Sequence, residues 1–295
     1  MVTIRKKQIG EQTYYYLEHT VRKKENIEKK EQYLGKTIPK NIEGLKKEFV
    51  YTLYKKRWYS ILDKIKHGFT QEIKHTPPSA REIEREKFTV HFTYDTQKIE
   101  GSTLSLRETA DLLERGITPK ARSFRDVKEA EAHKLIFEEM LTIKKDLSLN
   151  LVLYLHRKLF ETTKGDIAGK IRKHQVAISG SAFLPPTPVE VYPLLQDFFK
   201  WYTKNKTELN PVELAALVHF KFVTIHPFSD GNGRISRLLM NFVLYKHHYP
   251  FLNIHYEGRS SYYTALERAQ TKKMEFIFVQ WFVKKYIKEH QRYVT

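Results

Sequence analysis

The chain has 295 residues, of which 41% are hydrophobic, so it is long enough for two domains and can bury full apolar cores. It contains no cysteine, which excludes disulfides, thiolate metal sites and a cysteine nucleophile. Its 52 Lys and Arg residues against 34 Asp and Glu residues give a net charge of +18, which permits binding to nucleic acid, an anionic membrane or an acidic protein. Because Glu residues are interleaved with the basic ones in 22–31 and 46–57, as on solvated faces, the charge alone identifies no partner.

No stretch of the chain approaches the roughly 20 consecutive apolar residues that a membrane-spanning helix needs. The first residues also lack the hydrophobic region of a secretory signal peptide. We therefore expect a cytoplasmic protein without a membrane partner.

The N-terminal part is predicted to form a β-hairpin followed by a helix. Aromatic and β-branched residues gather in two segments of 13–35 that a polar linker separates, a pattern typical of a two-stranded hairpin. Such a hairpin is marginal alone and should pack on helices or on another chain, either as a structural appendage or as a docking arm for a partner or nucleic acid. An apolar stripe then predicts a helix over 45–66 that ends before Gly68. We expect a hairpin extension over 1–42 and a linking helix over 43–78.

The rest of the chain, 79–295, is predicted to be an all-α domain. Ser79 and Glu82 form a capping-box pattern that marks the start of its first helix. Apolar residues at helical spacing continue almost to the end of the chain. The further helices are expected over 105–116, 126–145, 149–160, 188–200, 212–225, 235–243 and 276–287. The first of these is expected to be capped at Ser105, with Glu108 at its third helical position.

The first helix of this domain should end at Gly101, a residue that readily stops a helix. Thr96 and Glu100 are four residues apart and therefore lie on one face of that helix. From the spacing alone, Glu100 is an ordinary exposed acid at a helix C-terminus, where the helix dipole slightly disfavours it.

A loop between two apolar helices, residues 226–237, contains the densest group of chemically useful residues. Gly231 and Gly233 allow a tight turn whose N–H groups, together with the start of the following helix, form an anion site. Arg234 and Arg237 are three residues apart and offer forked donors that suit phosphate oxygens.

Two further residues of the loop add chemistry to this anion site. Asp230 offers the hard oxygen ligand that Mg²⁺ prefers when it bridges phosphates. His226 can accept a proton near neutral pH. The loop therefore predicts a cradle for nucleotide phosphates with a metal carboxylate and a general base.

The same residues match, position by position, the motif His-x-Phe-x-Asp/Glu-Gly-Asn-Gly-Arg-x-x-Arg, so the chain resembles the Fic (filamentation induced by cAMP) family. The resemblance implies a Fic-type helical bundle with a short β-hairpin flap. It also implies a Mg²⁺-dependent protein adenylyltransferase, which transfers AMP from ATP to a Ser, Thr or Tyr hydroxyl of a target protein or of itself.

In the mechanism that the resemblance implies, His226 takes the proton of the attacking hydroxyl and Asp230 holds Mg²⁺. Gly231, Asn232 and Gly233 would hold the transferring phosphate, and Arg234 and Arg237 the leaving pyrophosphate. The residues expected to be catalytic are His226, Asn232 and Arg234.

The family also has an inhibitory helix with the motif Ser/Thr-x-x-x-Glu-Gly/Asn, which here reads Thr96, Glu100 and Gly101 in a helix of about 80–101. In the family this glutamate pairs with the second arginine of the catalytic motif, which is Arg237. A carboxylate in the fork of Arg237 would exclude the γ-phosphate and repel ATP. The resemblance thus implies an autoinhibited enzyme.

Alternating apolar residues and a turn at Gly180 predict a short hairpin within 174–184, where the family has its flap. The flap would cover the nucleotide and pair its edge with the target segment that bears the modified hydroxyl. Val176 would then touch adenine or the target, although packing alone also explains it. Tyr263 and Leu266 lie in a stretch that resembles the family segment beside adenine, so they are expected to flank the base.

Two alternatives stay open at this point. The same cradle could remove AMP from a modified protein, with Glu100 positioning a water. The chain could instead be a nucleic-acid-binding regulator whose cradle is vestigial. Relatives use dimerisation to set inhibition, so a homodimer is also possible from the resemblance. The sequence identifies neither the target protein nor the net direction of AMP transfer.

Overall fold

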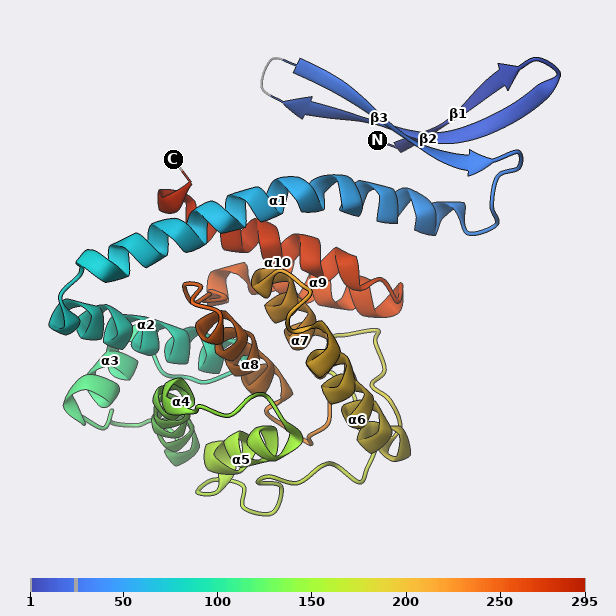
Figure 1. Ribbon diagram of the computed structural model, residues 1–295. Helices are drawn as coiled ribbons and strands as arrows, with labels where there is room; N and C mark the ends of the chain where they lie inside the picture. Colours follow the sequence, from blue (N-terminus) through green and yellow to red (C-terminus); the bar gives the residue numbers. More distant parts are fainter. Residues whose placement is uncertain (1, 24–25, 295) are drawn as a thin grey trace. The chain divides into compact units, whose positions relative to one another are not determined.

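The computed structural model describes residues 2–23 and 26–294. It divides the chain into two compact units, of which the first ends at Ile61 and the second begins at Leu62. Helix α1 (Ile42–His75) contains this boundary (Figure 1).

The first unit contains an antiparallel sheet of strands β1 (Val2–Ile9), β2 (Gln12–Lys23) and β3 (Asn26–Gly35), with β2 in the middle (Figure 1). The predicted hairpin of two strands is therefore incomplete, because β1 adds a third. Ile4 of β1 lies opposite Leu17, whose side chain is fully buried. The sequence pattern missed β1 because a run of basic residues interrupts its apolar alternation.

Aromatic rings join the sheet to the first part of α1 within this unit. His19 of β2 meets the Tyr54 ring at a centroid distance of 6.1 Å, and Tyr54 stacks on Trp58 at 5.8 Å. The helix is longer than expected, since Gly68 lies inside it and does not end it. A Cβ at Gly68 would approach the ring of Tyr293 to within 2.9 Å, so close packing explains the glycine.

The second unit is built from helices, as predicted, and the all-α fold class is confirmed. Its elements are α2 (Pro78–Ile99), α3 (Leu106–Arg115), α4 (Phe124–Thr142), α5 (Leu149–Phe160), α6 (Pro188–Asn205), α7 (Pro211–Ile225), α8 (Asn232–Lys246), η1 (Tyr256–Gly258), α9 (Arg259–Thr271), α10 (Glu275–Glu289) and η2 (Gln291–Tyr293).

The predicted capping box at Ser79 is wrong, because α2 begins at Pro78, two residues before the start that a cap at Ser79 implies. Pro77 is its N-cap and forms no side-chain cap hydrogen bond, and Pro78 occupies the first helical position. Proline suits that position because its fixed φ is already helical and its missing N–H would have no partner there.

The centre of the second unit is the pair α7 and α8, which pack against each other (Figure 1). Most residues of both helices are buried. Helix α8 also packs against α2, α4 and α5, while α7 packs against α6 and α10. The loop that joins α7 to α8 therefore lies between two helices that the core holds rigidly.

The hairpin expected within 174–184 is wrong in its pairing, since none of these residues belongs to a strand. Together with Pro185 and Pro186 they form a loop, called here the flap loop (174–186), in which Ser181 N–H donates to the Ile178 carbonyl at 3.1 Å. Its two arms are connected by a side chain, because Gln175 Nε2 donates to the Pro185 carbonyl at 3.1 Å. Two consecutive prolines in the returning arm lack the N–H donors of a strand ladder.

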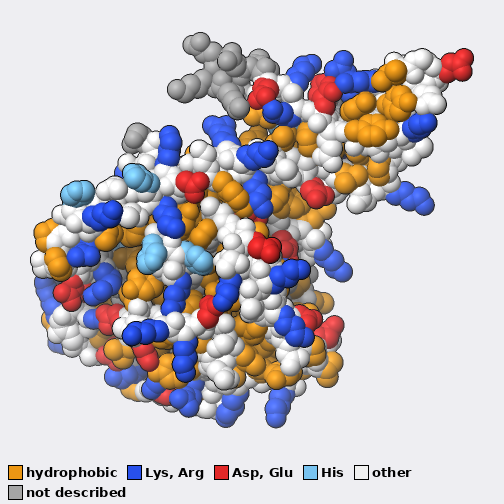
Figure 2. Space-filling view, in the orientation of Figure 1, with side chains coloured by type: hydrophobic (Ala, Val, Ile, Leu, Met, Phe, Trp, Pro, Cys, Tyr) orange, Lys and Arg blue, Asp and Glu red, His pale blue; other side chains and the backbone are white. Residues whose placement is uncertain are grey.

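The basic charge does not form one patch on the face shown in Figure 2, where Lys and Arg side chains are spread among Asp and Glu. This pattern matches solvated helix faces better than a nucleic-acid groove. No helix in the described part of the chain is long and apolar enough to cross a membrane.

Helix α3, which follows the end of α2, has the capping box that the sequence predicts. Ser105 Oγ accepts from Glu108 N–H at 3.2 Å, and the Glu108 carboxylate accepts from Ser105 N–H at 2.8 Å. We expect Ser105→Ala to lower the free energy of unfolding by about 1 kcal/mol, because an orphan N–H loses its partner. Urea unfolding followed by circular dichroism measures this. Ser179→Ala in the flap loop is the control and should change stability far less; equal stability of both variants would contradict the capping role.

Candidate active site

His226 ends α7 in a left-handed conformation, with φ 52° and ψ 57°. Its Nδ1 lies 3.2 Å from the Val223 carbonyl, which can only accept, so Nδ1 bears the hydrogen and Nε2 keeps its lone pair. Burial lowers the pKa of His226 and the charge of Arg172 lowers it further, while Glu100 and Asp230 act in the opposite direction. His226 is therefore a neutral base at neutral pH.

Two side chains fix the course of the loop that follows His226. Asn232 Oδ1 accepts from Phe228 N–H at 2.9 Å, and Asn232 Nδ2 donates to the Phe228 carbonyl at 2.8 Å. His156 stacks on the Phe228 ring at a centroid distance of 3.7 Å and lies 3.1 Å, by Nε2, from the Asp230 carbonyl. The side chain of Asn232 thus closes the loop, and both its amide oxygen and its amide nitrogen are used in these hydrogen bonds.

Little space surrounds either glycine of the loop, although the neighbours of Gly233 are the ends of flexible side chains. Gly231 has φ +81°, and a Cβ there would collide with the ring of Phe160. A Cβ at Gly233 would collide with the carboxylate of Glu100. That carboxylate therefore lies directly against the first turn of α8, the end of a helix that attracts anions.

The structure brings the predicted inhibitory residues onto Arg237, a fully buried side chain. Arg237 Nη2 donates to Glu100 Oε1 at 2.6 Å and to the Thr96 carbonyl at 3.2 Å, and Nε donates to Thr96 Oγ1 at 3.3 Å. Gly101 follows Glu100 with φ +95° and lets the chain leave the helix. One carboxylate thus occupies both the fork of Arg237 and the start of α8.

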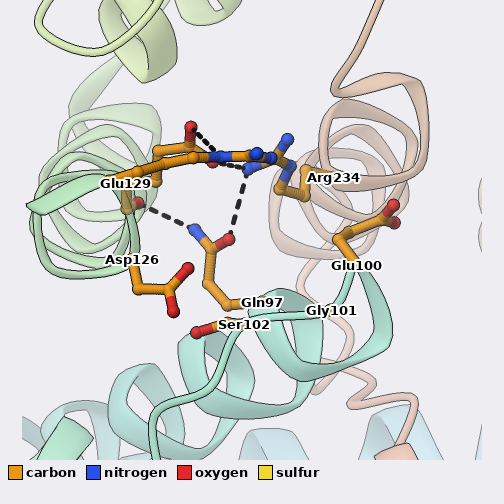
Figure 3. A pocket seen from close by; sticks show the side chains of 8 residues that line it. Gln97, Glu100, Gly101, Ser102, Asp126, Glu129 and Arg234 are labelled. Atoms are coloured by element: carbon orange, nitrogen blue, oxygen red, sulfur yellow. Dashed lines mark hydrogen bonds and ion pairs between the residues drawn. The ribbon is translucent and has the colours of Figure 1, made fainter. Parts of the chain in front are cut away.

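Arg234 is held by acids that the sequence did not reveal in full. It forms a buried ion pair with Glu129 of α4 and donates by Nη1 to Gln97 Oε1 at 3.3 Å (Figure 3). Its Nη2 donates to Asp230 Oδ1 at 3.0 Å. Gln97 Nε2 in turn donates to the Glu129 carbonyl at 2.8 Å. The sequence did contain one indication of Glu129: it is an acid beside Val127 and Ala130, on the buried face of its helix.

A small polar cavity of about 80 Å³ lies beside this network, between the end of α2 and α4 (Figure 3). Its lining consists of Gln97, Glu100, Gly101, Ser102, Arg125, Asp126, Glu129 and Arg234. The cavity thus adjoins both Glu100 and the Arg234 ion pair.

Asp230, the predicted metal ligand, is surrounded by cations. Its Oδ1 accepts from Gly231 N–H at 2.5 Å, its Oδ2 pairs with Lys164 Nζ, and Arg125 Nη2 lies 3.6 Å from Oδ2. Burial raises the pKa of Asp230, but the charges of Arg234 and Lys164 outweigh burial and bring it well below its usual range. An ionised, partly exposed carboxylate that already attracts a cation fits a Mg²⁺ ligand.

The residues expected beside adenine lie on one helix that the flap loop contacts. Tyr263 of α9 is half-exposed and its hydroxyl donates to the Ile99 carbonyl at 3.2 Å, whereas Leu266 of the same helix is buried. Glu267 Oε1 accepts from Ala182 N–H of the flap loop at 2.6 Å. Val176, which is partly buried, belongs to this loop and so lies in a segment bound to α9.

A charged cluster that sequence reasoning missed fastens α2 just before Thr96. Asp95 is buried; its Oδ2 accepts from Asn253 Nδ2 at 2.6 Å and lies 3.1 Å from His255 Nδ1, while Oδ1 accepts from Tyr256 N–H at 2.9 Å. His255 Nε2 lies 3.3 Å from Glu289 Oε1 of α10. Asp95 and Glu289 together raise the pKa of His255 to about 9.

This cluster predicts a stability that depends on pH. Because the pKa of His255 is raised from about 6.5 in the unfolded chain to about 9, its contribution is complete below pH 6.5 and lost as pH rises through 9. The midpoint of urea unfolding should therefore fall between pH 6.5 and 9 in the wild type. It should fall less in His255→Gln, while the exposed control His91→Gln should follow the wild type. Parallel curves for all three proteins would contradict the assignment.

Three comparisons with known proteins bear on this site. Residues 146–244 match the model of the Fic/DOC family. The chain is 32% identical over 236 residues to Protein adenylyltransferase fic-1 of Caenorhabditis elegans, which covers 77% of this chain and 46% of that protein. It is 33% identical over 263 residues to Protein adenylyltransferase Fic of Drosophila ananassae, covering 86% and 52%. The chain thus spans about half the length of these curated relatives.

Solved structures show the same fold. A Fic domain containing signaling protein from Bacteroides thetaiotaomicron has a TM-score of 0.70 at 27% identity, with 81% of this chain and 94% of that chain covered. Fic-1 from C. elegans has a TM-score of 0.70 at 28% identity, covering 86% and 76%.

Proposed function

Because this chain belongs to the Fic/DOC family, we propose that it is an autoinhibited protein adenylyltransferase, which transfers AMP from ATP to a hydroxyl side chain of a target protein. The observation that carries the proposal is the position of Glu100, whose carboxylate pairs with Arg237 and lies against the first turn of α8. An inhibited phosphate-binding site requires a preformed anion site that a carboxylate of the protein itself occupies.

In the proposed reaction, the target hydroxyl attacks the α-phosphorus in line with the leaving pyrophosphate. The new bond joins the hydroxyl oxygen to phosphorus, the bond to the pyrophosphate oxygen breaks, and the proton passes to His226 Nε2. Backbone N–H groups of 231–233 stabilise the charge on the transferring phosphate. Asn232 aids them by keeping the loop closed through Phe228, so that the donors are aimed before the substrate arrives.

The two arginines have different tasks in this proposal. Arg237 becomes available for the leaving phosphates once Glu100 departs, since its other partners are neutral oxygen atoms. Arg234 stays engaged with Glu129 and Asp230 and mainly orients the Asp230 carboxylate. Arg234 therefore contributes to phosphate binding chiefly through its charge.

Mg²⁺, when bound, would neutralise the α- and β-phosphate oxygens, and Asp230 would hold it. Lys164 shares Asp230 Oδ2, so its ammonium competes with a metal for that oxygen. On the far side of the site, Tyr263, Leu266 and Val176 are the residues proposed to contact adenine, and the flap loop is proposed to receive the target segment.

The alternatives from the sequence are less favoured. A vestigial cradle would not retain a loop that Asn232 closes. Nor would it retain a base, His226, whose Nε2 lone pair is available. The curated relatives are named for transfer of the adenylyl group. AMP removal would use the same residues and remains an outcome of the first experiment below.

The first test is Glu100→Gly with α-labelled ATP and Mg²⁺, with label counted on protein. Because freeing Arg237 removes a competitor worth about 1–3 kcal/mol, and 1.4 kcal/mol is tenfold, transfer to target or to itself should rise about tenfold or more. The matched control is Glu161→Gly, which alters an exposed glutamate at the C-cap of α5 and should leave labelling unchanged. A folded Glu100→Gly protein that labels no more than the wild type would overturn autoinhibition. If the wild type removes AMP from labelled protein and Glu100→Gly does not, the reverse reaction, with Glu100 positioning a water, would be favoured.

The second test examines the metal carboxylate through Lys164→Met. An ion pair of this partly exposed kind contributes up to about 1 kcal/mol, so Mn²⁺ binding with a non-hydrolysable ATP analogue should tighten about two- to fivefold. Electron paramagnetic resonance of free Mn²⁺ measures it without turnover. Lys158→Met, which removes an exposed lysine of α5, is the control. Unchanged or weaker Mn²⁺ binding in Lys164→Met would show that Lys164 does not compete for Asp230.

A further inference from the structure

Arg172, which immediately precedes the flap loop, is a buried arginine whose hydrogen bonds all go to backbone carbonyls. Its Nε donates to the His226 carbonyl at 2.7 Å and its Nη2 to the Pro186 carbonyl at 2.6 Å. Its Nη1 donates to the His174 carbonyl at 3.1 Å, and its own N–H donates to the Pro227 carbonyl at 3.0 Å. One residue therefore joins both arms of the flap loop to the backbone of the general base.

Burying the Arg172 guanidinium costs free energy, which argues that this arginine has a specific role. Arg172 is 3% exposed, and among the described residues it has no ion pair with a carboxylate. A buried cation without a counter-ion loses hydration that carbonyl dipoles only partly replace. Burial accordingly lowers the pKa of Arg172, although an arginine stays charged at any physiological pH. Its unneutralised charge acts on the groups around it.

The backbone that Arg172 holds is strained. His226 has φ 52°, a conformation that is unfavourable for a non-glycine residue and persists only where its surroundings fix it. Arg172 binds the carbonyls of His226 and of the next residue, Pro227. Because the direction of the imidazole follows from this backbone, the two bonds aim Nε2.

This inference rests on the proposed function. We propose that Arg172 is a positioning residue that connects the flap loop to the general base, so that the target segment is held in a fixed position relative to His226. Three charged groups face His226: Arg172 from the segment before the flap loop, Glu100 from α2 and Asp230 from its own loop. The charge of Arg172 opposes that of the two acids, and it adds to burial in keeping the imidazole neutral. Neutral imidazole is the form that can accept the hydroxyl proton.

The test uses two variants of the full chain. Arg172→Gln removes the charge and part of the fork, whereas Arg172→Lys keeps the charge and loses the fork. Proton NMR titration of His226, identified by its absence in His226→Gln, should show an upward pKa shift in Arg172→Gln and little change in Arg172→Lys. Glu100→Gln should shift the same pKa downward. Arg107→Gln, at an exposed site on α3, is the control.

Fastening of the flap loop is measured by trypsin cleavage after the exposed Lys173. Cleavage should be faster in both variants, since either loses bonds to His174 and Pro186. In the Glu100→Gly background, kcat for target labelling should fall about 10- to 100-fold in both, as misplacement of a reacting group by about 1 Å predicts. If Arg172→Gln fails to fold, the Lys variant still tests the fastening.

Two results would overturn the proposal. One is an unchanged His226 titration in Arg172→Gln, and the other is wild-type trypsin resistance in Arg172→Lys. Both measurements need neither ATP nor turnover, so absence of AMP transfer in every variant would refute the proposed function and leave this inference to be judged on its own data.

Discussion

The contact on which the site depends is the ion pair of Glu100 with Arg237, because it decides which anion occupies the start of α8. The rest of the structure holds the last turn of α2 in place for it. Asp95 is bound from η1, Gln97 is bound to α4, and the Ile99 carbonyl accepts from Tyr263 of α9. With the helix held on three sides, Glu100 leaves Arg237 most cheaply by rotating its own side chain, which is 28% exposed.

The charges of the site balance one another before any substrate arrives, and burial decides which of them can change. Arg234 is paired with Glu129, whose side chain is only 4% exposed, so removing that acid would leave the buried cation with only Asp230, which Lys164 shares, as its counter-ion. Glu100 is open to solvent and Asp230 is shared with Lys164. In the proposed function, the anion that a phosphate would replace is therefore Glu100, and the cation that a metal would replace is Lys164. Glu129 belongs to the permanent framework.

The sequence predicted what depends on local pattern. Apolar spacing located the helices of the second unit, Ser105 and Glu108 marked a cap, and 226–237 was identified as an anion site. It could not predict Glu129 or the Asp95 and His255 pair, because these contacts join residues more than a hundred positions apart and arise only from helix packing. Strand β1 was missed because basic residues hide its alternation, and the flap was misjudged because side chains rather than a strand ladder connect its arms.

Arg172 and Glu100 act on the pKa of His226 in opposite directions, and in the proposed function this would link inhibition to the strength of the base. When Glu100 leaves, His226 loses a negative neighbour, and burial and Arg172 then favour the neutral imidazole more strongly. A nucleotide phosphate that takes the place of Glu100 restores negative charge at the start of α8 and returns the proton affinity toward its inhibited value. In the proposed function, the exchange of one anion for another would thus open the cradle to substrate and preserve the electrostatic setting in which His226 accepts a proton.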